Sequence, residues 1–127
     1  MYRNKMEELT KWKESANRKP LIIRGARQVG KTWLMKEFGK EYYEKCAYIN
    51  FDDNTRMNKL FDEDFDLERI IQGLKIESGV NIEPENTLII LDEIQETPKA
   101  LKALKYFCEN AREYHIISAG SLLGVVI

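Results

Sequence analysis

The chain has 127 residues, of which 20 are basic and 21 acidic, so its formal net charge is only −1. This length suits one domain with a buried core and excludes two domains of ordinary size, and the balanced charge indicates no general attraction to nucleic acid or acidic membranes. No stretch approaches the roughly 18 apolar residues of a membrane span, and the start, MYRNKMEELTKWK, lacks the apolar segment of a secretory signal. We therefore expect a soluble, cytoplasmic protein.

The predicted elements alternate between helices and strands. Tyr2, Met6, Leu9 and Trp12 recur at helical spacing and predict an amphipathic first helix that ends before Pro20. Further helices are predicted over residues 31–45, 67–78 and 97–111. Short apolar runs predict strands over residues 21–24, 46–51, 87–91 and 115–119. Residues 52–66 are predicted to form a polar, acidic connection.

This alternation is typical of a parallel sheet whose right-handed crossovers place helices on both faces, and it predicts an α/β fold. Thr97 and Pro98 mark the start of the last helix, as its cap and first-turn residue. In such sheets ligands bind beyond the carboxyl ends of the strands. Residues that directly follow the strands are therefore the first candidates for function.

The segment after the first predicted strand, GARQVGKT, matches the phosphate-binding pattern GxxxxGK[ST] in full and leads into a helix. Its two glycines allow the tight turn in which main-chain amides wrap a phosphate chain. The helix start adds free N–H groups, Lys31 reaches the terminal phosphates, and Thr32 offers a hydroxyl to Mg²⁺. An ordinary glycine loop is the alternative. The predicted nucleotide-binding residues are Gly25, Ala26, Arg27, Gln28, Val29, Gly30, Lys31, Thr32 and Trp33.

Two carboxylates end the third predicted strand, in the stretch LIILDE. Asp92 is expected to hold Mg²⁺ together with Thr32, through the water shell of the ion, because Mg²⁺ takes few protein ligands. Glu93, on the other face of the pleat, is expected to orient or deprotonate an attacking water. A solvated acidic strand end is the alternative. Since a water-activating carboxylate serves hydrolysis, the pair favours an ATPase over a kinase.

Five stretches together resemble the N-terminal ATPase module of a prokaryotic AAA-type P-loop family: RKPLIIRGARQVGKT, YINFDD, LIILDEIQ, ALKALKYFCEN and IISAGSLLG. The resemblance implies a three-layer P-loop fold of the additional-strand class, with sheet order 5-1-4-3-2. It also implies that a polar residue after strand four senses the γ-phosphate. Ser121 and Ser118 both qualify, and Ser121 is favoured because Gly120 allows a turn there; plain turn serines are the alternative. The predicted catalytic residues are Glu93, Lys31 and Ser121.

Relatives of this kind continue past GSLLG into a fifth strand, later helices and a C-terminal domain, so residues 1–127 are expected to be an N-terminal ATPase fragment. An arginine that completes the site is expected beyond this end; Arg27, Arg69 and Arg112 are candidates in name only. Because such an arginine contributes roughly 10³ to 10⁵ in rate, turnover is expected to be slow. Without a fifth strand, strand one becomes an open edge, which predicts self-association.

The hypothesis is Mg²⁺-dependent binding and hydrolysis of ATP, coupled to a C-terminal domain. The alternative is a nucleotide-dependent switch or scaffold with little turnover. A small-molecule kinase is disfavoured because no arginine-rich lid segment is evident. No membrane or nucleic-acid partner is indicated.

Several other residues are expected to have structural or surface roles. Cys46 and Cys108 form no CxxC or Cys/His pattern and are expected to be buried structural thiols. His115 is expected to be structural or surface-exposed, and Trp12 to pack in the core rather than cover a base. Asp52 and Asp53 are assigned to a solvated loop. Gln28 and Gln95 are assigned weak contacts with phosphate and with water, respectively.

Overall fold

The computed structural model describes residues 2–23 and 29–120, with side chains for residues 4–23 and 30–120. Its helices are α1 (Tyr2–Glu14), α2 (Val29–Tyr42), α3 (Thr55–Glu63), α4 (Leu67–Ser78), α5 (Pro98–Asn110) and the short 3₁₀ helix η1 (Ile94–Glu96). Its strands are β1 (Leu21–Ile23), β2 (Lys45–Asn50), β3 (Thr87–Asp92) and β4 (His115–Ala119). Every strand expected from the sequence is present, with bounds that agree to within a residue. Within the described ranges, none of the helices has the length and apolarity needed to cross a bilayer.

The four strands form one parallel sheet in the order β1-β4-β3-β2. The last strand along the chain, β4, lies between β1 and β3. This is the order that the resemblance to the additional-strand class implies for these strands, and the predicted α/β fold is confirmed. Because all strands run in the same direction, the ends of β1 and β3 meet at one edge of the sheet.

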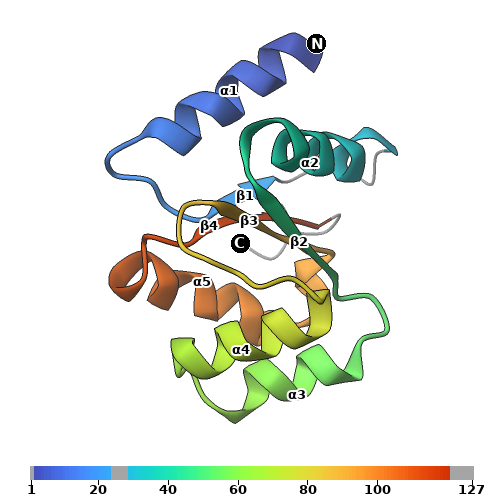
Figure 1. Cartoon of the computed structure of the whole chain (residues 1–127). Coiled ribbons are helices and arrows are strands. Elements are labelled where there is room, and N and C mark those ends of the chain that lie inside the picture. Colours follow the sequence, from blue (N-terminus) through green and yellow to red (C-terminus); the bar gives the residue numbers. More distant parts are fainter. Residues whose placement is uncertain (1, 24–28, 121–127) are drawn as a thin grey trace.

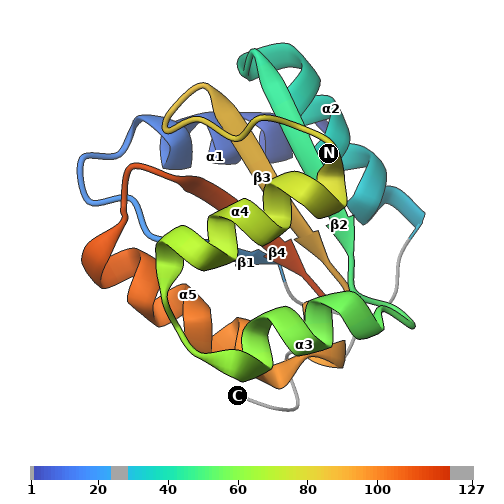
Figure 2. The same cartoon turned by 60° about the horizontal axis from the view of Figure 1, so that its bottom comes forward.

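The molecule has three layers, with α1 and α2 on one face of the sheet and α3, α4 and α5 on the other (Figure 1 and Figure 2). Each face has its own apolar core. Fully buried members on the α1–α2 face are Met35, Phe38, Leu88 and Ile90. Fully buried members on the α3–α5 face are Ile70, Leu74, Ile89 and Ile116. Strand β3 therefore contributes alternate residues to the two cores, as its pleat requires.

Helix α3 corrects the prediction that residues 52–66 form only a polar, acidic connection. Its Met57 and Phe61 are one turn apart, and both are buried in the core on the α3–α5 face. Asn54 caps the helix, because its side-chain oxygen accepts the N–H of Met57 at 3.1 Å. The many charged residues of this segment occupy its outer face, so its composition is polar. Burial of a narrow apolar stripe nevertheless offsets the conformational entropy that the segment loses when it becomes ordered. Asp66, also in this segment, caps α4.

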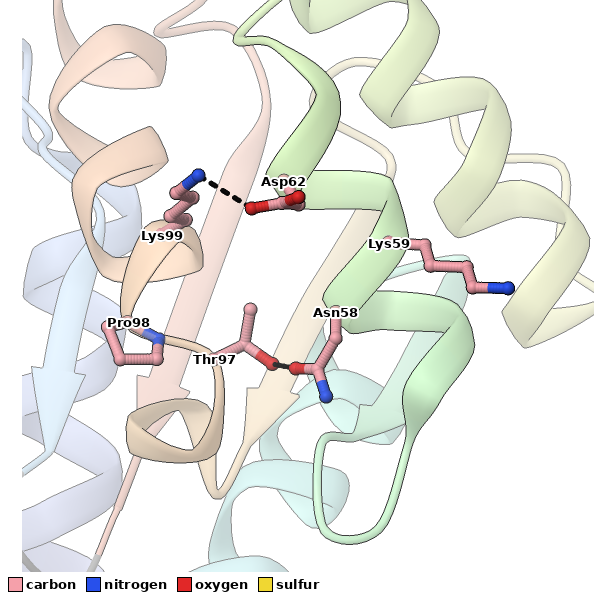
Figure 3. A pocket seen from close by; sticks show the side chains of 6 residues that line it. All are labelled: Asn58, Lys59, Asp62, Thr97, Pro98 and Lys99. Carbon is pink, nitrogen blue, oxygen red and sulfur yellow. Dashed lines mark hydrogen bonds and ion pairs between the residues drawn. The ribbon is translucent and has the colours of Figure 1, made fainter.

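The start of α5 also differs in detail from the expectation. Thr97 stands at the N-cap position, but its side chain makes no capping bond. Its hydroxyl donates instead to the side-chain oxygen of Asn58 on α3, and Lys99 pairs with Asp62 at 2.6 Å, so these contacts join α3 to α5 (Figure 3). The shallow surface pocket between the two helices is lined by Asn58, Lys59, Asp62, Thr97, Pro98 and Lys99.

His115 and Trp12 belong to the packing of the α1–α2 face, in line with their structural expectation. His115 is 4 % exposed, and its Nδ1 lies 2.6 Å from the hydroxyl of Tyr43. Trp12 is half-buried, donates its ring N–H to the Lys19 carbonyl at 2.6 Å, and stands edge-on to His115. The two free cysteines are half-buried rather than fully buried.

Candidate functional site

The start of α2 and the end of β3 meet at the carboxyl edge of the sheet. The hydroxyl of Thr32 donates to Oδ2 of Asp92 at 2.7 Å, although the two residues are 60 positions apart. The pleat explains the meeting: Leu88 and Ile90 pack toward α2, and Asp92 follows them on the same face. The residues assigned to the metal from sequence are therefore direct neighbours.

The Asp92 carboxylate is 5 % exposed and accepts two further hydrogen bonds. The hydroxyl of Tyr48 on β2 donates to Oδ2 at 2.7 Å, and the main-chain N–H of Glu93 donates to Oδ1 at 3.0 Å. Burial raises the pKa of Tyr48, and its hydrogen bond to Asp92 raises it further, so the phenol stays protonated and acts as a donor. The buried carboxylate of Asp92 therefore accepts three hydrogen bonds from neighbouring groups, as buried polar groups generally require.

Tyr48 was not among the residues predicted from the sequence. Within a stretch such as CAYINF, a tyrosine is an ordinary strand residue. The signal lies in the sheet register, in which Asn50 is the partner of Asp92 and Tyr48 precedes Asn50 by two positions on the same face. Only the order of the strands makes this neighbourhood visible.

Glu93 does not continue the pleat of β3, which corrects the expectation that it lies on the opposite face of the strand. The strand ends at Asp92, and Glu93 adopts the left-handed conformation with φ 54° and ψ 44° before η1 begins. Its carboxylate accepts a hydrogen bond from the side-chain amide of Gln95 at 2.8 Å. The other amide atom of Gln95, Oε1, is buried and has no hydrogen-bond partner in the described part of the chain.

The described end of the glycine loop is the first turn of α2. Gly30, its second residue, is exposed, and a Cβ built on it would meet no heavy atom within 4 Å. Lys31 and Thr32 follow, and the Trp33 side chain is 54 % exposed. The N-terminal end of helix α2 thus lies at the same edge of the sheet as Asp92.

Part of the predicted site lies outside the described residues: Gly25, Ala26, Arg27, Gln28 and Ser121, together with the side chain of Val29. Ser118, the other serine considered for the γ-phosphate, is fully buried in β4. Its register partner is Leu91, which belongs to the core on the α3–α5 face, whereas Asp92 faces α2. The Ser118 hydroxyl is thus on the face of the sheet opposite to the Thr32–Asp92 pair.

Other side chains named from the sequence are engaged elsewhere. Arg69 pairs with Asp64 at 2.9 Å, and Arg112 donates to the Cys108 carbonyl at 3.0 Å. Asp52 and Asp53 are exposed, as expected for a solvated loop. The pocket in Figure 3 contains none of the predicted phosphate or metal residues.

The oxygen donors at this edge suit Mg²⁺. A hydroxyl and a carboxylate lie within 2.7 Å of each other, and both are hard ligands of the kind that this ion takes. Among the described residues no group of three His, Cys, Asp or Glu side chains could form a complete protein cage for a metal.

Comparisons with known proteins agree with this geometry. A family model described as AAA domain matches residues 17–126. No curated protein matches the chain. Among solved structures, C. elegans PCH-2 is similar in fold, with a TM-score of 0.52 and 17% identity; the match covers 99% of this chain and 35% of that one. The chain therefore belongs to the AAA domain family, and it is a nucleotide-binding module of the ATPase type.

Proposed function

We propose that the protein binds ATP with Mg²⁺ at the carboxyl edge of its sheet and hydrolyses it. The glycine loop and Lys31 would hold the phosphates, Thr32 and Asp92 the metal ion, and Glu93 the attacking water. Ser121 would sense the γ-phosphate. Mg²⁺ supplies neutralisation of the phosphate charge when bound; the chain supplies the oxygens that hold it.

The observation that carries the proposal is the 2.7 Å hydrogen bond from Thr32 to Asp92. A hydroxyl that donates its proton to a carboxylate keeps its lone pairs for a cation. The bond also joins the first turn of α2, which contains the end of the GxxxxGKT pattern, to the acidic end of β3. Two sequence motifs with complementary roles are thus supported by one contact.

Binding is tested by calorimetry with MgATP on wild type, Lys31→Ala and Lys40→Ala. Lys40 lies in the last turn of the same helix and is exposed, so it is the matched control. We expect heat of binding for wild type and Lys40→Ala, and its loss for Lys31→Ala. The proposal would be refuted if MgATP gave no heat of binding with the wild type, or if Lys31→Ala bound MgATP with wild-type affinity.

Hydrolysis is tested separately with Glu93→Gln. Replacing the carboxylate should lower turnover by about 10²-fold or more while ATP still binds, because a neutral amide cannot accept the proton of water. Glu96→Gln, three residues on, is the control. Unchanged turnover in Glu93→Gln would exclude the proposed role of this residue.

A second candidate function is a nucleotide-dependent switch with little turnover. It is favoured by the 2.8 Å bond from Gln95 to Glu93, which engages the carboxylate that hydrolysis requires. In that case MgATP binds, turnover by the wild type is low, and Gln95→Ala raises it, because the Glu93 carboxylate is released. In either case the module would act in the cytoplasm, as part of a longer protein with a C-terminal domain.

A further inference from the structure

Tyr48 links the two elements of the proposed metal site. Its hydroxyl donates to Asp92 on the neighbouring strand, and the ammonium of Lys36 stands 4.0 Å from the centre of its ring. We propose that Tyr48 is a positioning residue that orients the Asp92 carboxylate and thereby sets the affinity of the site for Mg²⁺. The inference rests on the proposed function and adds to it a residue outside both motifs.

The distribution of hydrogen bonds over the carboxylate supports this role. A carboxylate oxygen accepts about two hydrogen bonds. Oδ2 accepts the hydroxyls of Thr32 and Tyr48, both at 2.7 Å, so its capacity is used. Oδ1 accepts the N–H of Glu93 and, counting only described residues, is the oxygen with capacity left. Tyr48 therefore determines which oxygen of Asp92 is available to water bound on a metal ion.

The surroundings of Tyr48 hold its hydroxyl in place. Lys36 follows Thr32 by one helical turn, so both project from the same side of α2. Thr32 contacts the carboxylate directly, and Lys36 contacts the ring that carries the second donor. The carboxylate is thus held by α2 through two routes, and a shorter hydroxyl residue at position 48 would not reach it.

The expected consequence is a change in metal affinity rather than in nucleotide contacts. Partners that orient a metal ligand typically change metal affinity by 10–100-fold when they are removed. Without the phenol, Oδ2 loses one of its two donors, and the carboxylate can rotate so that either oxygen faces outward. Mg²⁺ then selects from a mixture of orientations, and its binding weakens.

The test compares wild type, Tyr48→Phe and Tyr43→Phe in calorimetric titrations with ATP at increasing MgCl₂. Both substitutions remove one hydrogen-bonded hydroxyl and keep the ring, but the Tyr43 hydroxyl contacts His115, away from Asp92. We expect the MgCl₂ concentration that half-restores tight ATP binding to rise roughly 10-fold or more for Tyr48→Phe. Affinity for ATP in EDTA should not change, and Tyr43→Phe should match wild type in both measurements.

A second measurement uses the wild-type protein alone. The ring carbon bonded to the hydroxyl of Tyr48, labelled with ¹³C, should shift on addition of MgATP but much less with ATP in EDTA, and the same carbon of Tyr43 should not respond. Equal Mg²⁺ dependence of wild type and Tyr48→Phe, or an unresponsive Tyr48 signal, overturns the role of Tyr48 alone. Absence of any Mg²⁺-dependent ATP binding in wild type overturns the proposed function, and this inference with it.

Discussion

Gly30 is a glycine that the described fold does not itself require. Its φ is outside the left-handed region, and a Cβ at this position would find open space. Glycine in a helix is less favourable than alanine by roughly 0.5–1 kcal/mol. Glycine at this position therefore costs stability in the free protein. The proposed function explains its presence, because a phosphate must approach the backbone closely here.

We predict that Gly30→Ala separates stability from binding. The free protein should become more stable by up to about 1 kcal/mol, because alanine favours the helix, while binding of MgATP should be lost. Chemical denaturation and calorimetry on the same samples measure the two effects. A variant that binds MgATP like wild type would show that no ligand approaches this residue closely.

His115 predicts a dependence of stability on pH. Burial, together with smaller contributions from the nearby Arg18 and Lys13, lowers its pKa from 6.5 to about 4. Between these two values the unfolded chain binds a proton that the folded chain does not, so stability falls as the pH decreases from 6.5 to 4. The full contribution is about 3 kcal/mol, since each pKa unit corresponds to about 1.4 kcal/mol.

The substitution His115→Gln checks this contribution. Denaturant unfolding at several pH values should give a smaller loss of stability below pH 6.5 for the variant than for wild type, because the titrating group is gone. The comparison uses the slope with pH, so a constant difference in stability between the two proteins does not affect it. Parallel slopes would contradict the assignment.

At the level of elements, the caps and contacts of α3 show how a polar segment becomes ordered. The side chain of Asn54 is buried, and besides accepting the Met57 N–H it donates to the Asn50 carbonyl and to the Glu77 carboxylate, both at 3.0 Å. Asn54 thus joins the end of β2 to the start of α3 and the end of α4. Arg56 pairs with the same Glu77, at 2.8 Å.

We predict that Asn54→Ala destabilises the protein by about 1–2 kcal/mol, because the helix loses its cap and the Asn50 carbonyl and Glu77 carboxylate each lose a donor. Chemical denaturation measures the change. Asn110→Ala, at the exposed end of α5, is the control and should stay within about 0.5 kcal/mol of wild type. Equal stability of the two variants would show that the cap contributes little.

For the whole molecule, the strand order leaves β1 and β2 as the outer strands of the described sheet. The three residues of β1 are only partly buried, whereas β3 and β4 are buried throughout. An outer strand whose main-chain groups lack a neighbouring strand is a template for pairing with another chain. Membership in the AAA domain family, whose members frequently oligomerise, points in the same direction.

We therefore predict that the protein of residues 1–127 associates as its concentration rises. Light scattering coupled to size exclusion should show a molar mass above the 14.9 kDa of one chain at high concentration. The same measurement with MgATP shows whether the nucleotide changes the assembly. A single monomeric mass over the whole concentration range would contradict the prediction.

The fold was largely predictable from local patterns. The alternation of apolar runs predicted the parallel sheet, because strand and helix periods are properties of neighbouring residues. The strand order was predicted from the resemblance to a known family and not from these periods. Helix α3 was missed because its stripe, Met57 and Phe61, is narrow and surrounded by charges. Its order depends on burial of these two side chains in the core, which local composition does not record.

For the site, the motifs alone were enough to name Lys31, Thr32, Asp92 and Glu93 and to predict that a phosphate-binding loop and an acidic strand end share one edge. Folding in three dimensions added what depends on register and on the way a strand terminates. The pairing of β2 with β3 brings Tyr48 to Asp92, and the left-handed turn at Glu93 directs its carboxylate to Gln95. Such contacts join residues far apart in the chain or depend on one backbone torsion, and neither leaves a repeating signal in the order of amino acids.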